Sequence, residues 1–92
     1  MPNTAWLLDT DGTKKEVQPA NGREFTLEEV YALLGTDMVQ AHLMGDMLAL
    51  MDEEGKFKNV EVNFQATILL ADCLLPGDYI VGKVLYCKKG MF

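Results

Sequence analysis

The pattern of apolar and polar residues at the start of the chain predicts a β-hairpin. Residues 4–9, Thr-Ala-Trp-Leu-Leu-Asp, have the apolar content of a short strand. A turn is expected over residues 9–12, Asp-Thr-Asp-Gly, because aspartate side chains bond their own backbone and Gly12 is free to adopt positive φ. Residues 14–18 then form the returning strand. Pro19 and Asn21-Gly22 interrupt the chain before the next element.

A short helix follows, with clear signals at both of its ends. Thr26 and Glu29 have the spacing of a capping box, in which the threonine hydroxyl accepts from a free amide and the glutamate reaches back. Residues 27, 30, 31 and 34 (Leu, Val, Tyr and Leu) fall on one helical face, and Gly35 is a natural stop. The pattern therefore predicts a helix over residues 27–34 that lays one face on a sheet.

A second hairpin is predicted around Gly45-Asp46, a two-residue link typical of tight turns between strands. Its strands are residues 38–44 and 47–51, with cross-strand pairs 44 with 47, 43 with 48, 42 with 49, 41 with 50 and 40 with 51. Directly opposed residues share a face. One face then carries core residues (Val39, Ala41, Leu43, Leu48 and Leu50) and the other is rich in methionine (Gln40, His42, Met44, Met47, Ala49 and Met51). A one-residue slip would exchange the two faces.

The last third of the chain predicts a helix and a strand. Residues 57–62 are a candidate for a further extended segment, and Asn63 is placed to cap a helix that runs from residue 64 to about residue 74. Residues 79–87 predict the final strand, with Gly82 marking a bulge or a close approach of the backbone. The order ββαββαβ predicts a single α+β domain over residues 1–92, with a small, mainly antiparallel sheet and two short helices on one side of it.

The net charge of the chain indicates which classes of binding partner are unfavourable. Eight Lys and Arg against fourteen Asp and Glu give a net charge of −6. This disfavours direct binding of nucleic acid or of anionic membranes, since both require positive surface. No apolar run approaches the roughly 20 residues of a membrane span, and the first residues lack the features of a signal peptide. We therefore expect a cytoplasmic protein in which Cys73 and Cys87 are free thiols.

The residue types that usually carry catalysis are sparse. The chain has no serine and no glycine-rich phosphate loop, and Asp9-x-Asp11-Gly12 lacks the later ligands of a calcium loop. His42 is the only histidine, and neither cysteine has the spacing of a zinc site. The sequence therefore predicts a protein that is not an enzyme, with no catalytic residue, no metal site and no cofactor.

Two surfaces are candidates for binding. The methionine face, with Met44, Met47 and Met51, suits a ligand pocket or a subunit interface because thioethers adapt to their partners, and it predicts a homo-oligomer. The alternative is that a helix of the same chain covers it. The second surface is acidic: residues 24–55 hold eight acidic residues and no Lys or Arg, with Asp52, Glu53 and Glu54 adjacent. It either imitates a phosphate backbone or only supplies solubility.

Several short motifs together resemble a family of small domains of unknown function from bacteriophages and conjugative elements. They are Glu16-Val17 with Pro19-Ala-Asn21-Gly22, Phe25-Thr-Leu-Glu-Glu-Val30, Asp52-Glu-Glu-Gly-Lys56, Asn63-Phe-Gln-Ala66-Thr67 and Gly77-Asp-Tyr-Ile-Val-Gly82. The family has no established activity, so the resemblance supplies no catalytic residue. It implies a non-enzymatic inhibitor of host defence, acting either by sequestering a nucleotide second messenger or by blocking a defence protein.

The expected ligand is a small, nucleotide-like molecule held by a homo-oligomer. Its candidate contacts are Asn63 and Thr67 at the start of the second helix, together with His42 and Gln40 on the methionine face. Asn63 offers a donor and an acceptor near free helix amides; the alternative is that it caps the helix and does nothing more. In the second hypothesis the ligand is replaced by a basic surface of a host protein, which Asp52, Glu53 and Glu54 bind.

Overall fold

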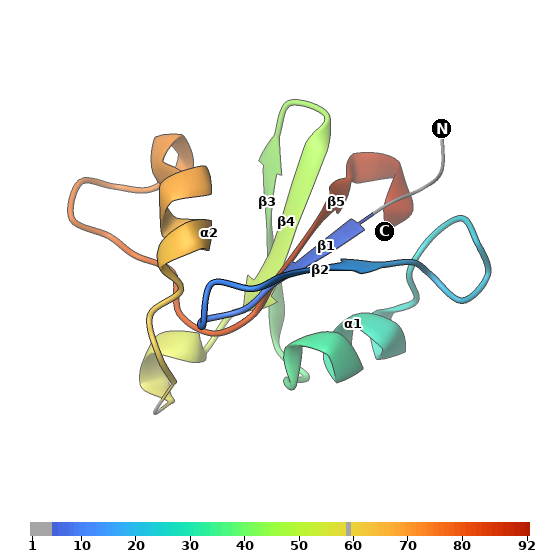
Figure 1. Ribbon diagram of the computed structural model, residues 1–92, viewed down its shortest axis with the longest axis horizontal. Coiled ribbons are helices and arrows are strands. Elements are labelled where there is room, and N and C mark those ends of the chain that lie inside the picture. Colours follow the sequence, from blue (N-terminus) through green and yellow to red (C-terminus); the bar gives the residue numbers. More distant parts are fainter. Residues whose placement is uncertain (1–4, 59) are drawn as a thin grey trace.

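The computed structural model describes residues 5–58 and 60–92, so residues 4 and 59 of two predicted extended segments lie outside the described part. One antiparallel sheet has the strand order β2-β1-β5-β4-β3. Its strands are β1 (Ala5–Leu8), β2 (Lys14–Val17), β3 (Val39–Met44), β4 (Met47–Asp52) and β5 (Val84–Lys88), and its α-helices are α1 (Leu27–Leu34) and α2 (Phe64–Leu69). The α+β class is confirmed. The two helices, however, lie on opposite sides of the sheet rather than on one (Figure 1).

The β3–β4 hairpin has the predicted register. Met44 pairs with Met47, and the pairing continues to Val39 opposite Asp52. Gly45 opens the two-residue turn with a φ of 60°, the left-handed region that a type II′ hairpin turn reserves for glycine at its first position. The two predicted faces of the hairpin are therefore the two faces of the sheet.

Helix α1 covers the first of these faces. Thr26 and Glu29 form the predicted capping box, and Gly35 ends the helix in the left-handed conformation. Val30 and Leu34 point inward and join Leu50 and Leu85 in a core on this side. Burial of these side chains fixes α1 on the sheet, as the spacing of its apolar residues predicts.

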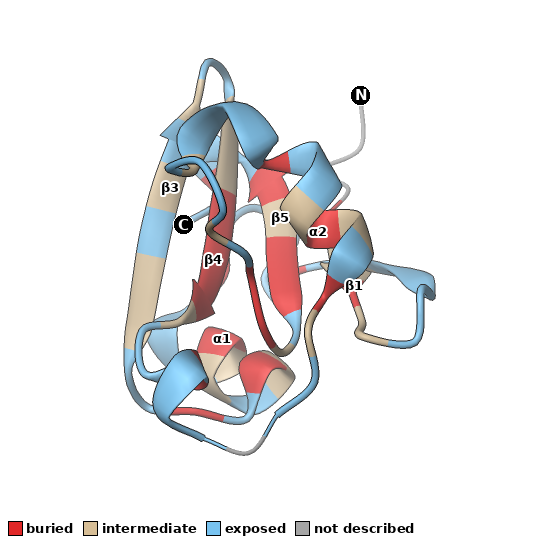
Figure 2. Cartoon of the chain, turned by 90° about the vertical axis from the view of Figure 1, so that its left-hand side faces the viewer, coloured by how far each residue is buried: buried red, intermediate tan, exposed pale blue. Residues whose placement is uncertain are grey.

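Helix α2 covers the opposite face, where Ala66 and Leu70 pack with Ala49, Met51 and Val84. Figure 2 shows buried residues concentrated along β4 and β5, which therefore have core on both sides. The helix is shorter than predicted because it ends at Leu69 and continues as a 3₁₀ turn, Ala71–Cys73. The Gln65 side chain ties α2 to the first hairpin by donating hydrogen bonds to the carbonyl oxygens of Asp9 (3.0 Å) and Thr13 (2.6 Å).

Two expectations about extended segments are wrong. Among the described residues of this stretch (57, 58 and 60–62) there is no strand: Phe57 ends a 3₁₀ turn, and Val62 forms an isolated bridge with Val81. Strand β5 begins at Val84, because residues 79–82 bond to α2 and its N-terminal flank instead of to a neighbouring strand. Gly82, with a φ of 75°, turns the chain from this segment toward the sheet, so the glycine signal in the sequence marks a change of direction.

Candidate functional site

A cleft of about 370 Å³ opens on the α2 side of the sheet, between β3, the turn at residues 52–57 and the segment 73–81. Of the side chains selected from the sequence, it brings together five: Gln40, His42, Met51, Asp52 and Glu53. It does not include Asn63, Thr67, Met44, Met47 or Glu54. The predicted contacts therefore separate into those that line a cavity and those that do not.

Gln40 and His42 form one wall of this cleft. They are two residues apart on β3, so their side chains leave the same face of the strand, and both are half-buried. Their Nε2 atoms lie 2.8 Å apart. Since an amide nitrogen only donates, the ring nitrogen is the acceptor. The Gln40 Oε1 acceptor and the His42 Nδ1–H donor then have no partner among the described residues, and both remain available to a ligand.

Lys56, Asp78 and Tyr79 form the facing wall. The Lys56 ammonium forms an ion pair with the Asp78 carboxylate and lies 4.5 Å from the centre of the Tyr79 ring. The hydrogen bond from Lys56, a second from the Tyr79 amide and the positive charge of Lys56 together hold the pKa of Asp78 below its usual value. The wall therefore offers a fixed ion pair and an aromatic residue that is 45% exposed, rather than an unbalanced positive charge.

The two thiols lie in contrasting environments. Cys73 is exposed and lines the cleft. Cys87 is on β5 and fully buried, and this burial raises the pKa of its thiol to about 11. Within residues 5–58 and 60–92, no group of three or more His, Cys, Asp or Glu side chains is arranged to hold a metal ion.

Asn63 is fully buried and engaged within the chain. Its Oδ1 caps α2 by accepting from the Ala66 amide (3.0 Å), and its Nδ2 donates to the carbonyl oxygens of Leu8 (2.9 Å) and Gly82 (2.8 Å). The capping alternative is therefore the one that the structure shows. A ligand could reach this amide only if the core opened, so Asn63 is corrected from a ligand contact to a structural residue.

Thr67 has a related structural role. Its hydroxyl donates to the Asn63 carbonyl oxygen at 2.8 Å and accepts from the Ile80 amide at 2.9 Å. Because Ile80 and Val81 line the cleft, Asn63 and Thr67 position one of its walls from behind. The polar groups of both side chains are therefore used within the protein, and Thr67 is corrected, like Asn63, from a ligand contact to a structural residue.

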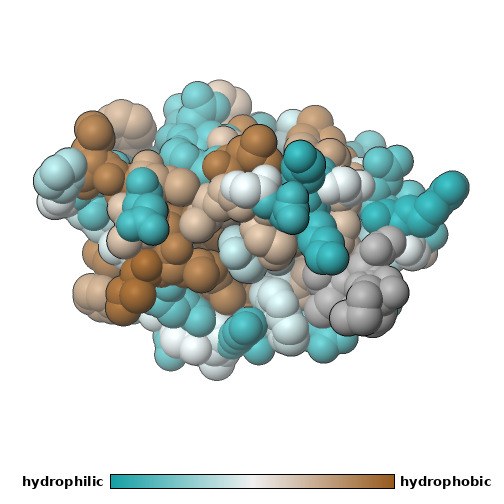
Figure 3. All heavy atoms as spheres, turned by 90° about the horizontal axis from the view of Figure 1, so that it is seen from above, coloured by the Kyte–Doolittle hydropathy of each residue, from teal (hydrophilic) through white to brown (hydrophobic). Residues whose placement is uncertain are grey.

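The methionine face is covered by the protein's own helix. Met51 is buried beneath α2, while Met44 and Met47 are half-buried. The alternative of a sheet packed on both sides within the chain is therefore what the structure shows, and Met51 is corrected from an interface residue to a core residue. Large exposed apolar side chains are instead found on α2 and the neighbouring turns (Phe57, Phe64, Ile68 and Leu75), and Figure 3 shows apolar surface at its left end, where α2 lies. The four-residue spacing of Phe64 and Ile68 is the signal that could have revealed this surface.

The acidic cluster is partly neutralised. Asp52 accepts hydrogen bonds from the Lys58 ammonium (2.6 Å), the Thr36 hydroxyl (3.1 Å) and the Glu54 amide (2.9 Å). Partial burial raises the pKa of Asp52, but these bonds outweigh it, so the pKa lies below its usual value. Of the three adjacent residues Asp52, Glu53 and Glu54, the last two are exposed, so the Asp52 carboxylate adds less to the acidic surface than the sequence suggests.

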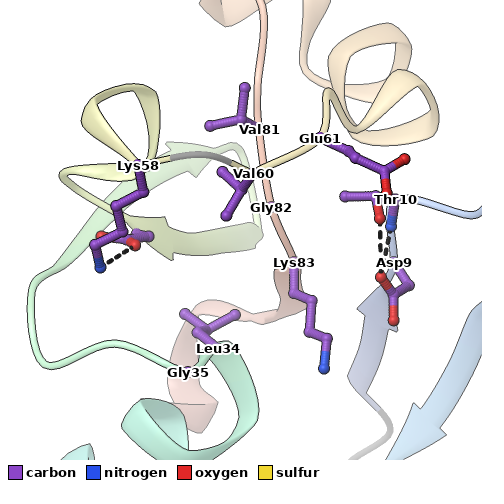
Figure 4. Close-up of a pocket in the computed structure, with 12 residues that line it drawn as sticks. Asp9, Thr10, Leu34, Gly35, Lys58, Val60, Glu61, Val81, Gly82 and Lys83 are labelled. Atoms are coloured by element: carbon purple, nitrogen blue, oxygen red, sulfur yellow. Dashed lines mark hydrogen bonds and ion pairs between the residues drawn. The ribbon is translucent and has the colours of Figure 1, made fainter.

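A second cleft of about 350 Å³ lies between the end of β1, the end of α1, the residues Lys58, Val60 and Glu61, and the segment 81–83. In Figure 4 the Lys83 side chain points between Leu34 and Asp9, while Lys58 is held by its ion pair. Three carboxylates (Asp9, Asp52 and Glu61) outnumber these two ammonium groups along its lining. It contains no aromatic side chain, and Asp52 is its only residue selected from the sequence. The cleft beside His42 is therefore the stronger candidate.

Comparison of the chain with protein-family models, with curated proteins and with solved structures finds no match. None of the helices formed by the described residues has the length and apolar character needed to cross a membrane.

Proposed function

We propose that this protein is a non-enzymatic binding protein that holds a small, nucleotide-like ligand in the cleft beside His42. The observation that carries the proposal is the Gln40–His42 pair, which leaves one acceptor and one donor unpaired within the described part of the chain, on two residues that line a cavity of about 370 Å³. An adjacent donor and acceptor are what the edge of a nucleobase presents in complementary form. Pockets with a few convergent polar groups among apolar ones are typical small-molecule sites.

The facing wall favours a planar ligand. Tyr79 presents part of its ring to the cleft, and base–aromatic stacking contributes about 1–3 kcal/mol per base. Lys56 is balanced by Asp78, and the chain as a whole carries a net charge of −6. Repulsion therefore disfavours ligands with several phosphates. A nucleoside or a nucleotide of low charge fits this combination.

The biological context of the proposal comes from the resemblance to phage and mobile-element domains. In that context the protein acts in the host cytoplasm as a counter-defence factor that sequesters a nucleotide signal. The alternative context is an acidic inhibitor that occupies a basic surface of a host defence protein through Glu53 and Glu54, the two exposed carboxylates of the cluster. Charge reversal at Glu54, which does not line the cleft, separates the hypotheses, because it weakens only the second kind of binding.

The direct test is an NMR titration with adenosine, AMP and GMP. His42 is the only histidine, so its ring signals are unambiguous reporters of the cleft. We expect these signals and the Tyr79 amide to shift on addition of at least one probe, and Gln40→Ala to weaken binding about tenfold through loss of one hydrogen bond. Gln18→Ala, at an exposed glutamine after β2, is the matched control and leaves binding unchanged. Absence of any shift with all three probes contradicts the proposal.

A further inference from the structure

The two edges of the sheet differ in how they are protected. β2 is one edge, with four residues that include Lys14, Lys15 and Glu16. Short length and charge are the usual means by which an edge strand avoids pairing with another chain. β3 is the other edge, at the left margin of the sheet in Figure 2. Its six residues, Val-Gln-Ala-His-Leu-Met, include no charged residue and no proline.

The backbone groups that β3 leaves unpaired can be identified. The Glu53 amide donates to the Met38 carbonyl oxygen at 2.7 Å, so the backbone of Met38 points toward β4. Backbone direction alternates along a strand, and residues 40, 42 and 44 therefore also point toward β4. The amides and carbonyls of Val39, Ala41 and Leu43 point away from the sheet. This edge offers three donors and three acceptors.

The sequence around this edge is symmetric in its chemistry. Counting outward from Ala41, the residues are Gln40 and His42, then Val39 and Leu43, then Met38 and Met44. Each pair matches polar with polar or apolar with apolar. A two-fold symmetric interface requires this self-complementarity, since residue i of one copy meets residue j of the other and the reverse.

We propose that a second copy of this chain pairs with β3 along its whole length, antiparallel and centred on Ala41. In this register Ala41 faces Ala41 of the partner subunit, and Val39 faces Leu43 of the partner subunit. These positions exchange the outward backbone hydrogen bonds. The two five-stranded sheets become one continuous sheet, which is the geometry of β-strand addition.

The surrounding side chains support this register. Leu43 is 61% exposed and Met38 is 41% exposed. Pairing of the strands therefore removes apolar surface of both side chains from contact with water, which stabilises the dimer. The nearest acidic residues, Asp37 and Asp46, fall opposite Gly45 of the partner subunit and Thr36 of the partner subunit. No carboxylate meets a carboxylate, which matters for a chain of net charge −6.

The pairing also connects the two copies at the cleft. Gln40 faces His42 of the partner subunit in a non-hydrogen-bonded pair, where the side chains of opposed strands are closest. The two Gln40–His42 pairs then lie next to each other across the two-fold axis. The dimer proposal is based only on the edge strand β3, so it does not depend on the ligand proposal.

Sedimentation velocity tests the dimer. The wild-type chain of 10.3 kDa is expected to sediment as a dimer of twice that mass. Ala41→Lys places two ammonium groups against each other on the two-fold axis and is expected to give a monomer with an unchanged circular dichroism spectrum, since Ala41 is exposed in the single chain. Ala32→Lys adds the same charge at an exposed alanine of α1 and is expected to remain dimeric. A monomeric wild type, or a dimeric Ala41→Lys variant, overturns the proposal.

Disulfide formation tests the register in a Cys73→Ser background. Ala41→Cys is expected to form a cross-linked dimer under mild oxidation, because opposed Cα atoms of a hydrogen-bonded pair lie about 5.5 Å apart. Leu43→Cys is expected not to form this cross-link. In this register the two copies of residue 43 lie four residues apart, about 13 Å along the strand. Cross-linking through residue 43 but not through residue 41 overturns the register.

Discussion

The side-chain amide of Asn63 donates a hydrogen bond to the main-chain carbonyl oxygen of Leu8, a residue 55 positions earlier in the chain. A second bond from the same amide reaches the Gly82 carbonyl oxygen. One buried side chain thereby connects the end of β1, the start of α2 and the segment that forms a wall of the cleft. Asn63 therefore stabilises the fold and also positions a wall of the candidate site.

Replacement of Asn63 is expected to be strongly destabilising. Asn63→Ala removes the cap and leaves the buried carbonyls of Leu8 and Gly82 without this donor, at a cost of about 3 kcal/mol or more. Asn63→Asp keeps an acceptor for the cap but loses both donated bonds, so it remains destabilising. Urea unfolding measures both. The exposed Asn21→Ala is the control, with a cost below about 1 kcal/mol; an Asn63→Ala cost no larger than this control contradicts the structural role.

The capping box of α1 makes the free energy of unfolding depend on pH in the acid range. Hydrogen bonds from the amides of Thr26 and Ala20 lower the pKa of Glu29 from its usual value of 4.5. The native state therefore binds fewer protons than the unfolded state around this pH. The stabilisation is fully present above pH 4.5 and is lost as the pH falls through the lower native pKa.

The midpoint of urea unfolding, measured as a function of pH, reports this dependence. Glu29→Gln is expected to reduce the change of the midpoint with pH below pH 4.5. Glu28→Gln is the matched control, because Glu28 lies in the same first turn of α1 but is not part of the capping box. It is expected to leave the profile below pH 4.5 as in the wild type. Identical effects of the two substitutions would contradict the assignment to Glu29.

The two thiols are expected to differ in reactivity. Cys73 is exposed, whereas Cys87 is buried with a pKa raised to about 11, so that it has little thiolate. Ellman's reagent should modify one thiol per native chain and two in denaturant, and Cys73→Ser should remove the native reaction. Because Cys73 lines the cleft, a bound nucleoside should slow its modification. Prompt reaction of both thiols in the native chain would contradict this account.

Gly55 is expected to tolerate no side chain without rearrangement. A Cβ atom at this position would lie 2.8 Å from Val81 Cγ2, so Gly55→Ala should cost about 1–3 kcal/mol through overpacking. Val81→Ala removes that contact, and the double variant should lose less stability than the sum of the single ones. Gly90→Ala is the control, since nothing lies within 4 Å of its Cβ position. Additive costs would show that the contact is not the cause.

The sequence predicts those elements whose signals lie within a few neighbouring residues. The capping box of Thr26 and Glu29 and the two-residue turn at Gly45 specify α1 and the β3–β4 hairpin locally. They also place Gln40 and His42 on one face. The side of the sheet that each helix covers depends on long-range packing, and no pattern in the sequence separated α1 from α2 in this respect.

The rest of the cleft depends on contacts between distant segments. The β-rich residues 79–83 depart from the sheet because Thr67 and Asn63 bond their backbone, which overrides their intrinsic propensity. The ion pair of Lys56 and Asp78 likewise joins residues 22 positions apart. Helical spacing alone could have revealed the exposed Phe64 and Ile68, since Ala66 and Leu70 lie on the buried face of the same helix.

Native mass spectrometry of protein purified without denaturation from the cells that produce it, repeated after denaturation, tests the central claim most directly. It reports the number of subunits and any retained small molecule in one measurement. The account predicts a dimer of two 10.3 kDa chains that releases a nucleoside- or nucleotide-sized mass on denaturation. A bare monomer, with no mass released, would contradict it.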